Sequence, residues 1–370
     1  MKKKETIIFL APTPPPFMGP TIATEIILCS RFVRQFHVIH IDTCDRRPLS
    51  NLGKLDFMNI YLSLKNYFFL LEKLLTSDGA LVYIPIAQTS IGFLRDLPFV
   101  FLAKIFRKKV VLHLRGGYFR SFYDKSSQFM RVIIRSVLKN TDRLIVLGNS
   151  IKELFKGLIS EERISVVPNG LDIEFNNKKD IEANSFIVLY LSNFAETKGY
   201  KEVLRSVNKV SQFNNKIKYI FAGSWMNERD KHKFIRFIKE ERMERYVHLV
   251  EDARKEEKLK LLSYADIFVF PTYYPYEGHP WVIVEAMAAG LPIITTDTGC
   301  IKESVVDGEN GFIIPPNDSD SIAEKIIYLM KHPEERKRMG LISRKSYENS
   351  FTEEHFVQRM IQAINCTLSS

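Results

Sequence analysis

The 370-residue chain is predicted to be an α/β protein made of two doubly wound domains. Short apolar runs alternate with helical segments from end to end, and this alternation stops over the polar stretch 176–184 and then restarts. The length also favours two cores over one. We therefore expect domains at 1–175 and 176–350. Helical spacing of apolar residues predicts a closing helix within 351–370; spacing leaves its host domain open, and the first domain is the candidate.

Each predicted strand is a short buried run bounded by helical segments, as in parallel sheets that crossover helices cover. In the first domain the runs are Thr6–Leu10, Phe36–Ile41, Ala80–Ile84, Lys109–Leu114, Arg143–Leu147 and Ile164–Val167. In the second domain they are Phe186–Leu191, Ile217–Ala222, Val247–Leu249, Ile267–Phe270 and Pro292–Thr295.

The composition is that of an ordinary globular protein, with 45% hydrophobic and 26% charged residues. Four scattered cysteines have no paired metal spacing, which predicts a reduced cytoplasmic protein without structural zinc. The apolar run at Ile7–Leu10 is too short for a signal peptide, and no run reaches the roughly 20 residues of a membrane span.

The net charge of +10 lies entirely in the first half of the chain. Residues 1–180 hold 27 Lys and Arg against 16 Asp and Glu, or +11, whereas residues 181–370 hold 26 against 27, or −1. A basic half indicates nucleic acid, an anionic membrane surface or an acidic substrate, with solvated lysines as the plain alternative. No recognised nucleic-acid module accompanies the charge, so we expect no nucleic-acid partner.

Basic and aromatic residues gather at Tyr118–Tyr123 and on the helical segment that follows. There Arg131, Arg135 and Lys139 are expected opposite an apolar face that includes Phe129 and Val132. This pattern fits a membrane face or a grip on a lipid pyrophosphate, and it equally fits an amphipathic helix packed on its sheet.

The most informative stretch is Glu277–Pro292, which places two carboxylates eight positions apart. Glu277 is expected on a loop, whereas Glu285 lies inside a helix that begins at Pro280 and ends at Gly290. A buried strand precedes this loop. A strand that leads through a loop into a helix N-terminus is the usual position for an anionic ligand in an α/β protein.

Two further turns of the second domain follow buried strands. Lys198 precedes a glycine and a helix, and a lysine there suits a phosphate, although a Lys-Gly pair is also a common turn. Gly223 ends the next strand, where a glycine permits close approach of a ligand or simply forms a turn.

The first domain offers weaker signals at three loops. Gly19 follows a proline-rich turn after the first strand, a common phosphate-facing position that here lacks the GxGxxG pattern of nicotinamide sites. His113 and Arg115 share a face at the end of a strand and are followed by a double glycine. Pro168–Asp172 reads first as a turn.

Taken in order, these motifs resemble the retaining GT-B glycosyltransferases of the group-1 (family-4) class. The match is most specific over 265–316 and diffuse over 1–165. The resemblance implies two Rossmann-like domains facing a central cleft, with an acceptor bound by the first and a nucleotide-diphospho-sugar by the second. It rests on Gly19, His113–Gly117, Pro168–Asp172, Lys198-Gly199, Glu277, Glu285–Pro292 and Asp307–Phe312.

The resemblance also implies roles for single residues. Glu285 would accept hydrogen bonds from the ribose hydroxyls, Glu277 would face the donor sugar, and Lys198 would bind the diphosphate in place of a metal. The predicted catalytic residues are Glu277, Lys198, Arg115 and His113. The predicted donor-binding residues are Gly19, Asn193, Lys198, Gly223, Gly278, His279, Pro280, Trp281, Val282 and Glu285. The predicted acceptor-binding residues are Arg115, Tyr118 and Arg120.

No metal or other cofactor is expected beyond the UDP- or GDP-linked sugar as co-substrate. Asp318-Ser319-Asp320 has the letters of a metal-binding DxD motif, but it opens a helix, where Asp and Ser are typical N-caps. Two positions depart from the family pattern. Asn193 stands where the family usually has an arginine that assists the phosphate lysine, and Arg115 stands where it commonly has a histidine.

The predicted function is metal-independent transfer of a sugar, with retention, to a saccharide or lipid-linked saccharide in cell-surface polysaccharide assembly. The predicted location is cytoplasmic, with peripheral contact to the anionic inner face of the plasma membrane as an option. Two alternatives remain: a nucleotide-sugar 2-epimerase of the same fold, and a non-catalytic partner subunit, which the departures at Asn193 and Arg115 motivate.

Overall fold

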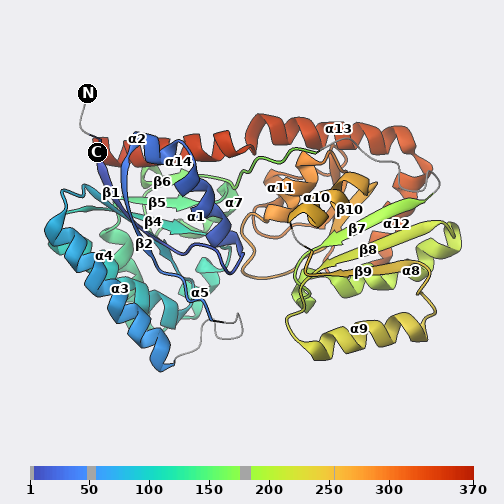
Figure 1. Cartoon of the computed structure of the whole chain (residues 1–370), viewed down its shortest axis with the longest axis horizontal. Coiled ribbons are helices and arrows are strands. Elements are labelled where there is room, and N and C mark those ends of the chain that lie inside the picture. The colour runs from blue at the N-terminus through green and yellow to red at the C-terminus, as the bar shows by residue number, and fades with distance from the viewer. Residues whose placement is uncertain (1–3, 48–55, 176–184, 254) are drawn as a thin grey trace. The chain divides into compact units, whose positions relative to one another are not determined.

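The computed structural model describes residues 4–47, 56–175, 185–253 and 255–370, which form two compact units (Figure 1). Unit 1 comprises Met1–Asn169 and Glu353–Ser370, and unit 2 comprises Gly170–Thr352. The chain thus leaves unit 1 after Asn169, whereas the sequence led us to place the boundary after residue 175, and it returns to unit 1 at Glu353.

Unit 1 contains a parallel six-stranded sheet in the order β2-β1-β3-β4-β5-β6. All six residues of β1 are buried, and Phe9 on this strand stacks on Tyr83 of β3 with ring centroids 4.1 Å apart. The strands are β1 (Thr6–Ala11), β2 (His37–Asp42), β3 (Leu81–Ile86), β4 (Lys109–Leu114), β5 (Arg143–Val146) and β6 (Ile164–Val166).

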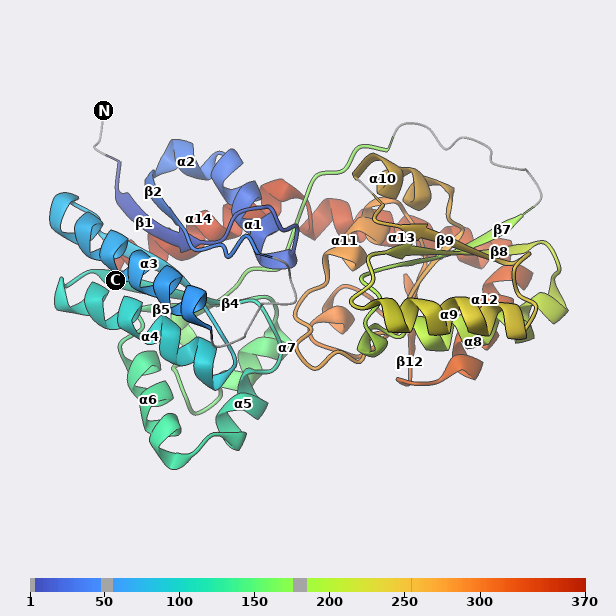
Figure 2. The ribbon, with the colours of Figure 1, turned by 60° about the horizontal axis from the view of Figure 1, so that its bottom comes forward.

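Helices cover both faces of this sheet (Figure 2). The crossover from β1 to β2 runs opposite to those from β2 to β3 and from β3 to β4, and right-handed crossovers therefore put their helices on opposite faces. The helices are α1 (Gly19–Cys29), α2 (Phe32–Gln35), α3 (Phe57–Thr76), α4 (Ser90–Ile105), α5 (Phe119–Lys125), α6 (Gln128–Lys139), α7 (Asn149–Lys152) and α14 (Glu353–Ser369).

The closing helix predicted within 351–370 is confirmed as α14, which belongs to unit 1 and contacts β4 and β5. Its buried face includes Phe356, Met360 and Ile364. Two basic side chains of the sheet also hold it: Lys109 Nζ donates to the carbonyl of Thr367 at 2.8 Å, and Arg143 Nε donates to Thr367 Oγ1 at 3.0 Å.

Unit 2 repeats the architecture with a parallel sheet in the order β12-β11-β10-β7-β8-β9. Its strands are β7 (Phe186–Leu191), β8 (Ile217–Gly223), β9 (Val247–Glu251), β10 (Ile267–Phe270), β11 (Ile293–Thr296) and β12 (Gly311–Ile314). Its helices are α8 (Tyr200–Phe213), α9 (Glu228–Glu240), α10 (Lys255–Tyr264), α11 (Trp281–Ala288), α12 (Ser319–Lys331) and α13 (Pro333–Ser350).

Three sequence expectations are wrong in detail. Strand β12 was missed, because its four residues follow a turn and two of them are only half-buried. Phe119, Phe122 and Tyr123 are core residues of α5, so their aromatic rings do not form a membrane face. On α6 the expected apolar face is rotated, since Phe129 and Val132 are exposed while Arg131 and Arg135 both contact Tyr123. Among the residues that the structure describes, no helix is long and apolar enough to cross a membrane.

Candidate active site

Lys198 and Glu277 meet at the carboxyl end of the sheet in unit 2. Lys198 follows β7 and Glu277 follows β10, and these strands are parallel neighbours, so their loops emerge at one edge. Lys198 Nζ lies 2.6 Å from Glu277 Oε2, and Thr272 Oγ1 donates to the same oxygen at 3.0 Å. Glu277 is buried, so the pair is fixed before any ligand arrives.

Aromatic rings confine the Lys198 ammonium. Its Nζ lies 4.5 Å from the ring centroid of Tyr274 and 5.6 Å from that of Phe270. Burial, followed by the charge of Glu277, raises the pKa of the Tyr274 phenol. A neutral phenol keeps its ring available for the cation–π contact at physiological pH.

Gly199 explains how the Lys198 loop reaches the Pro271 loop. Gly199 has a φ of 80°, and a Cβ at this position would lie 2.3 Å from the carbonyl oxygen of Pro271. The backbone N–H of Tyr273 donates to the carbonyl of Thr197 at 2.8 Å and joins the two loops. The glycine is therefore required by the close approach of the two backbones that present Lys198 and Glu277.

Glu285 sits within α11, as predicted, and this helix begins at Trp281 with Pro280 as its N-cap, one position after the predicted start. The side chain is 5% exposed. Its Oε1 pairs with Lys258 of α10, but its Oε2 is buried without a hydrogen-bond partner in the described part of the chain. A buried carboxylate oxygen is stabilised by a donor, and a ligand hydroxyl would supply one.

The remaining residues predicted around α11 have contacts within unit 2. His279 Nε2 lies 2.8 Å from Ser304 Oγ, and its ring stands 5.3 Å from that of Phe351. The carbonyl of Gly278 accepts from the N–H of Cys300 at 2.8 Å. Pro280 and Trp281 are buried in unit 2, and Val282 is half-buried.

Gly223 and Asn193 lie at the carboxyl ends of β8 and β7. A Cβ on Gly223, whose φ is 152°, would stand 1.9 Å from the carbonyl oxygen of Ser192. The close approach at Gly223 is thus to the protein's own backbone. Asn193 is exposed, and its carbonyl accepts from the N–H of Ala195 at 2.8 Å.

In unit 1, His113 and Arg115 end β4 with different surroundings. His113 is completely buried, and its Nδ1 lies 2.7 Å from the hydroxyl of Tyr83. Burial, and then the charge of Arg115, lowers the pKa of His113 well below its usual range. Arg115 Nη1 donates to Asn169 Oδ1 at 3.2 Å. A neutral, enclosed imidazole is a core group of the sheet in this structure.

The other predicted residues of unit 1 lie at helix starts. Gly19 is the first residue of α1. Tyr118 precedes α5, and its hydroxyl accepts from Lys125 Nζ at 3.0 Å. Arg120 is exposed and pairs with Asp124 at 3.0 Å. Arg120 and Tyr118 are accessible, but internal partners already hold both side chains.

Asp318 is confirmed as a helix cap. Its Oδ1 accepts from the N–H of Ser321 at 2.9 Å at the start of α12. The letters of the DxD motif are accounted for by this cap.

Sequence reasoning missed Thr272 and Lys258. Thr272 directly follows the strand and Pro271, so its position after β10 was a usable signal. Lys258 lies on α10, and nothing in its surroundings along the chain indicates that it will meet Glu285.

Comparison with known proteins shows which proteins the chain is similar to. Residues 172–346 match the family described as "Glycosyl transferases group 1". The chain is also similar to the structure of Anabaena HepE in complex with UDP, with 18% identity, a TM-score of 0.74 and coverage of 98% of this chain and 99% of that one. The two parallel doubly wound units have the GT-B fold, as predicted.

Two curated relatives show partial similarity. The chain is 28% identical over 228 residues to the capsular polysaccharide biosynthesis glycosyltransferase CapM of Staphylococcus aureus. This match covers 57% of this chain and 58% of CapM. It is 23% identical over 258 residues to a GDP-mannose:cellobiosyl-diphosphopolyprenol alpha-mannosyltransferase of Xanthomonas oryzae pv. oryzae (strain PXO99A). This match covers 69% of this chain and 67% of that protein. The chain thus spans little more than half the length of CapM.

Proposed function

We propose that the protein transfers a sugar, with retention and without a metal ion, from a nucleotide-diphospho-sugar to a saccharide or lipid-linked saccharide in cell-surface polysaccharide assembly. The observation that carries the donor half is the cluster of Lys198, Glu277 and Glu285 around the end of β10 and the start of α11. The HepE complex with UDP and the relatives CapM and the mannosyltransferase support the reaction class.

In this proposal each side chain meets a different part of the donor. Ribose hydroxyls donate to Glu285 Oε2, which lacks a partner in the described residues. The diphosphate lies against Lys198, so the bond between the sugar C1 and the phosphate oxygen breaks while the departing charge is neutralised. The acceptor oxygen forms the new bond to C1 on the same face, and the proton of its hydroxyl passes to the departing diphosphate oxygen. Glu277 faces the donor sugar and orients it.

The acceptor is assigned to unit 1, whose basic excess suits an anionic molecule or membrane surface. Arg115, Tyr118 and Arg120 are the residues we propose for acceptor contact. A location on the cytoplasmic face of the plasma membrane follows from a lipid-linked acceptor and is part of the same proposal.

Incubation with UDP-, GDP- and ADP-linked sugars and candidate acceptors tests the activity through release of nucleoside diphosphate. Glu285→Ala should weaken nucleoside diphosphate binding by roughly tenfold or more, because a hydrogen bond to a charged group is lost. Glu324→Ala, on the exposed side of α12, is the matched control. Unchanged binding in Glu285→Ala would refute the donor site, and conversion of donor without acceptor would favour an epimerase.

A further inference from the structure

A cavity of about 750 Å³ lies in unit 1 between the carboxyl end of β2 and one side of α3. None of the site residues predicted from the sequence lines it. Its volume falls within the range of small-molecule sites, about 300–1,000 Å³. The carboxyl ends of parallel strands are also where α/β sheets bind their ligands.

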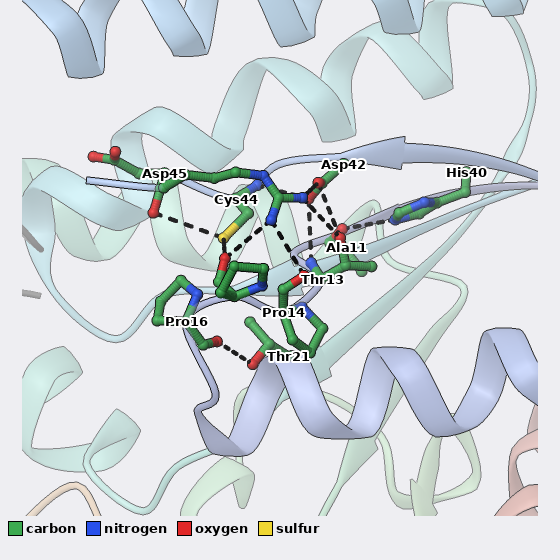
Figure 3. A network of polar contacts seen from close by, with 11 residues as sticks. Ala11, Thr13, Pro14, Pro16, Thr21, His40, Asp42, Cys44 and Asp45 are labelled. Atoms are coloured by element: carbon green, nitrogen blue, oxygen red, sulfur yellow. Dashed lines mark hydrogen bonds and ion pairs between the residues drawn. The ribbon is translucent and has the colours of Figure 1, made fainter. Parts of the chain in front are cut away.

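The polar wall of the cavity is built around Asp42 (Figure 3). Asp42 accepts hydrogen bonds from Thr13 Oγ1 at 2.9 Å, from the N–H of Cys44 at 3.0 Å and from Arg46 Nη2 at 2.5 Å. Burial raises the pKa of Asp42, but these hydrogen bonds outweigh burial and hold the pKa below its ordinary value. Arg46 also donates to carbonyls of the proline-rich turn, so the wall is rigid before a ligand binds.

The lining carboxylates are all paired with lining cations. The pairs are Asp42–Arg46 at 2.5 Å, Asp45–Arg47 at 2.7 Å and Glu72–Lys73 at 2.6 Å. Within the described residues, Lys65 is the lining cation that no carboxylate contacts, and its Nζ stands 5.5 Å from the ring centroid of Phe69. Arg47 also pairs with Asp56 at 2.8 Å, so Lys65 is the lining cation left available for a ligand, and a lysine ammonium is suited to a phosphate.

An exposed apolar stripe on α3 lies on the helix face next to the one that lines the cavity. Phe57, Tyr61, Leu64 and Phe68 are 85%, 55%, 59% and 67% exposed and recur at i, i+4, i+7 and i+11, so they share one face of the helix. Each helical residue is rotated by about 100° from the one before, and Lys65 therefore stands beside this stripe. If Lys65 holds the phosphate of a ligand, the part of the ligand attached to that phosphate can contact the apolar side chains of the stripe.

We propose that the cavity binds the phosphate-bearing head of a lipid-linked acceptor and that the hydrocarbon chain of this acceptor lies along the α3 stripe. The proposal rests on the proposed function, because it names the acceptor class for that reaction. One amphiphile accounts for three features together: the hydrogen-bonded polar wall, the ammonium of Lys65, which no carboxylate of the described residues contacts, and the neighbouring apolar stripe of α3.

Calorimetric titration of the full chain with decyl phosphate, decyl maltoside and inorganic phosphate, without nucleotide sugar, tests the proposal. Decyl phosphate should bind most tightly. Lys65→Gln should weaken its binding about tenfold, since a charged hydrogen bond is lost, whereas Lys139→Gln on α6 should not. The double variant Leu64→Gln and Phe68→Gln should weaken decyl phosphate binding and leave inorganic phosphate unaffected, with Leu341→Gln on α13 as its exposed control.

Three outcomes would overturn the proposal: equal binding of decyl maltoside, equal binding of inorganic phosphate, or full affinity in Lys65→Gln. Thermal melting of each variant excludes misfolding as the cause of a loss. Release of nucleoside diphosphate and binding of UDP are measured on the same proteins. If the protein transfers sugar but Lys65→Gln binds decyl phosphate with full affinity, the proposed acceptor site is wrong and the proposed function stands. If decyl phosphate binding depends on Lys65 but no donor and acceptor pair gives sugar transfer, the proposed function is wrong and the binding site stands.

Discussion

The ammonium of Lys198 lies 2.6 Å from the carboxylate of Glu277, so the cation assigned to the diphosphate already has an anionic partner. A diphosphate that binds Lys198 must therefore compete with Glu277 or share the ammonium with it. When the donor is absent, Glu277 compensates for part of the charge of Lys198, and Lys198 keeps the buried carboxylate paired.

The competition leads to a prediction for Glu277→Gln. Removal of the carboxylate releases Lys198, and the variant should bind nucleoside diphosphate at least as tightly as the parent. Its turnover should fall by about 100-fold or more, because the group that orients the donor sugar is changed. Calorimetry with UDP or GDP and steady-state rates check the two halves. Weaker nucleotide binding together with normal turnover would contradict both assignments.

The Lys258–Glu285 pair is expected to stabilise unit 2. Glu285 is almost fully buried, and Lys258→Met would leave its charge without the partner seen in the structure. We expect the free energy of unfolding to fall by about 1–3 kcal/mol, less than for a fully buried pair because Lys258 is partly exposed. Chemical denaturation measures the change. Lys325→Met, which removes an exposed pair on α12, should cost much less.

His113 should make the protein less stable in mild acid. Its folded pKa is depressed, so it stays neutral while the unfolded chain gains a proton below a pKa of about 6.5. Stability contributed by this residue is therefore complete above pH ~6.5 and falls by up to about 1.4 kcal/mol per pH unit below it. His113→Gln should flatten the pH dependence of the unfolding free energy between pH ~6.5 and ~5. His232→Gln, at an exposed position, should leave the slope unchanged.

Gly223 and Gly308 offer a matched test of backbone crowding. Both have positive φ, but a Cβ on Gly223 would meet the Ser192 carbonyl at 1.9 Å, whereas nothing lies within 4 Å of one on Gly308. Gly308→Ala should cost about 1–2 kcal/mol for the left-handed conformation alone. Gly223→Ala should cost clearly more and should lower the melting temperature further. Equal losses in the two variants would show that the β7 and β8 ends separate easily.

The strands were predictable because buried parallel strands leave continuous apolar runs. The match of 172–346 to the group-1 model was foreshadowed by the specific motif order over 265–316. The side-chain partners were not predictable. Lys198 and Glu277 are 79 positions apart, and only the order of β10 beside β7 brings them together. The partners of His279 were unpredictable for the same reason, since Ser304 and Phe351 reach it from distant segments.

The cavity of unit 1 was harder to predict, since it depends on contacts between β2, the loop after it and α3. Asp42, Arg46 and Lys65 form no motif along the chain, and the apolar residues of α3 read as an ordinary helix. Their significance appears only when exposure is known, because Phe57 and Phe68 look like core residues in the sequence.

Helix α14 has a consequence for how the protein acquires its fold during synthesis. Unit 1 begins the chain, but β4 and β5 are covered on one face by residues that follow all of unit 2. While the ribosome is still making unit 2, the sheet of unit 1 lacks the apolar side chains that α14 supplies. Unit 2 is contiguous and can close first, so the first segment to emerge is the last to become a finished domain.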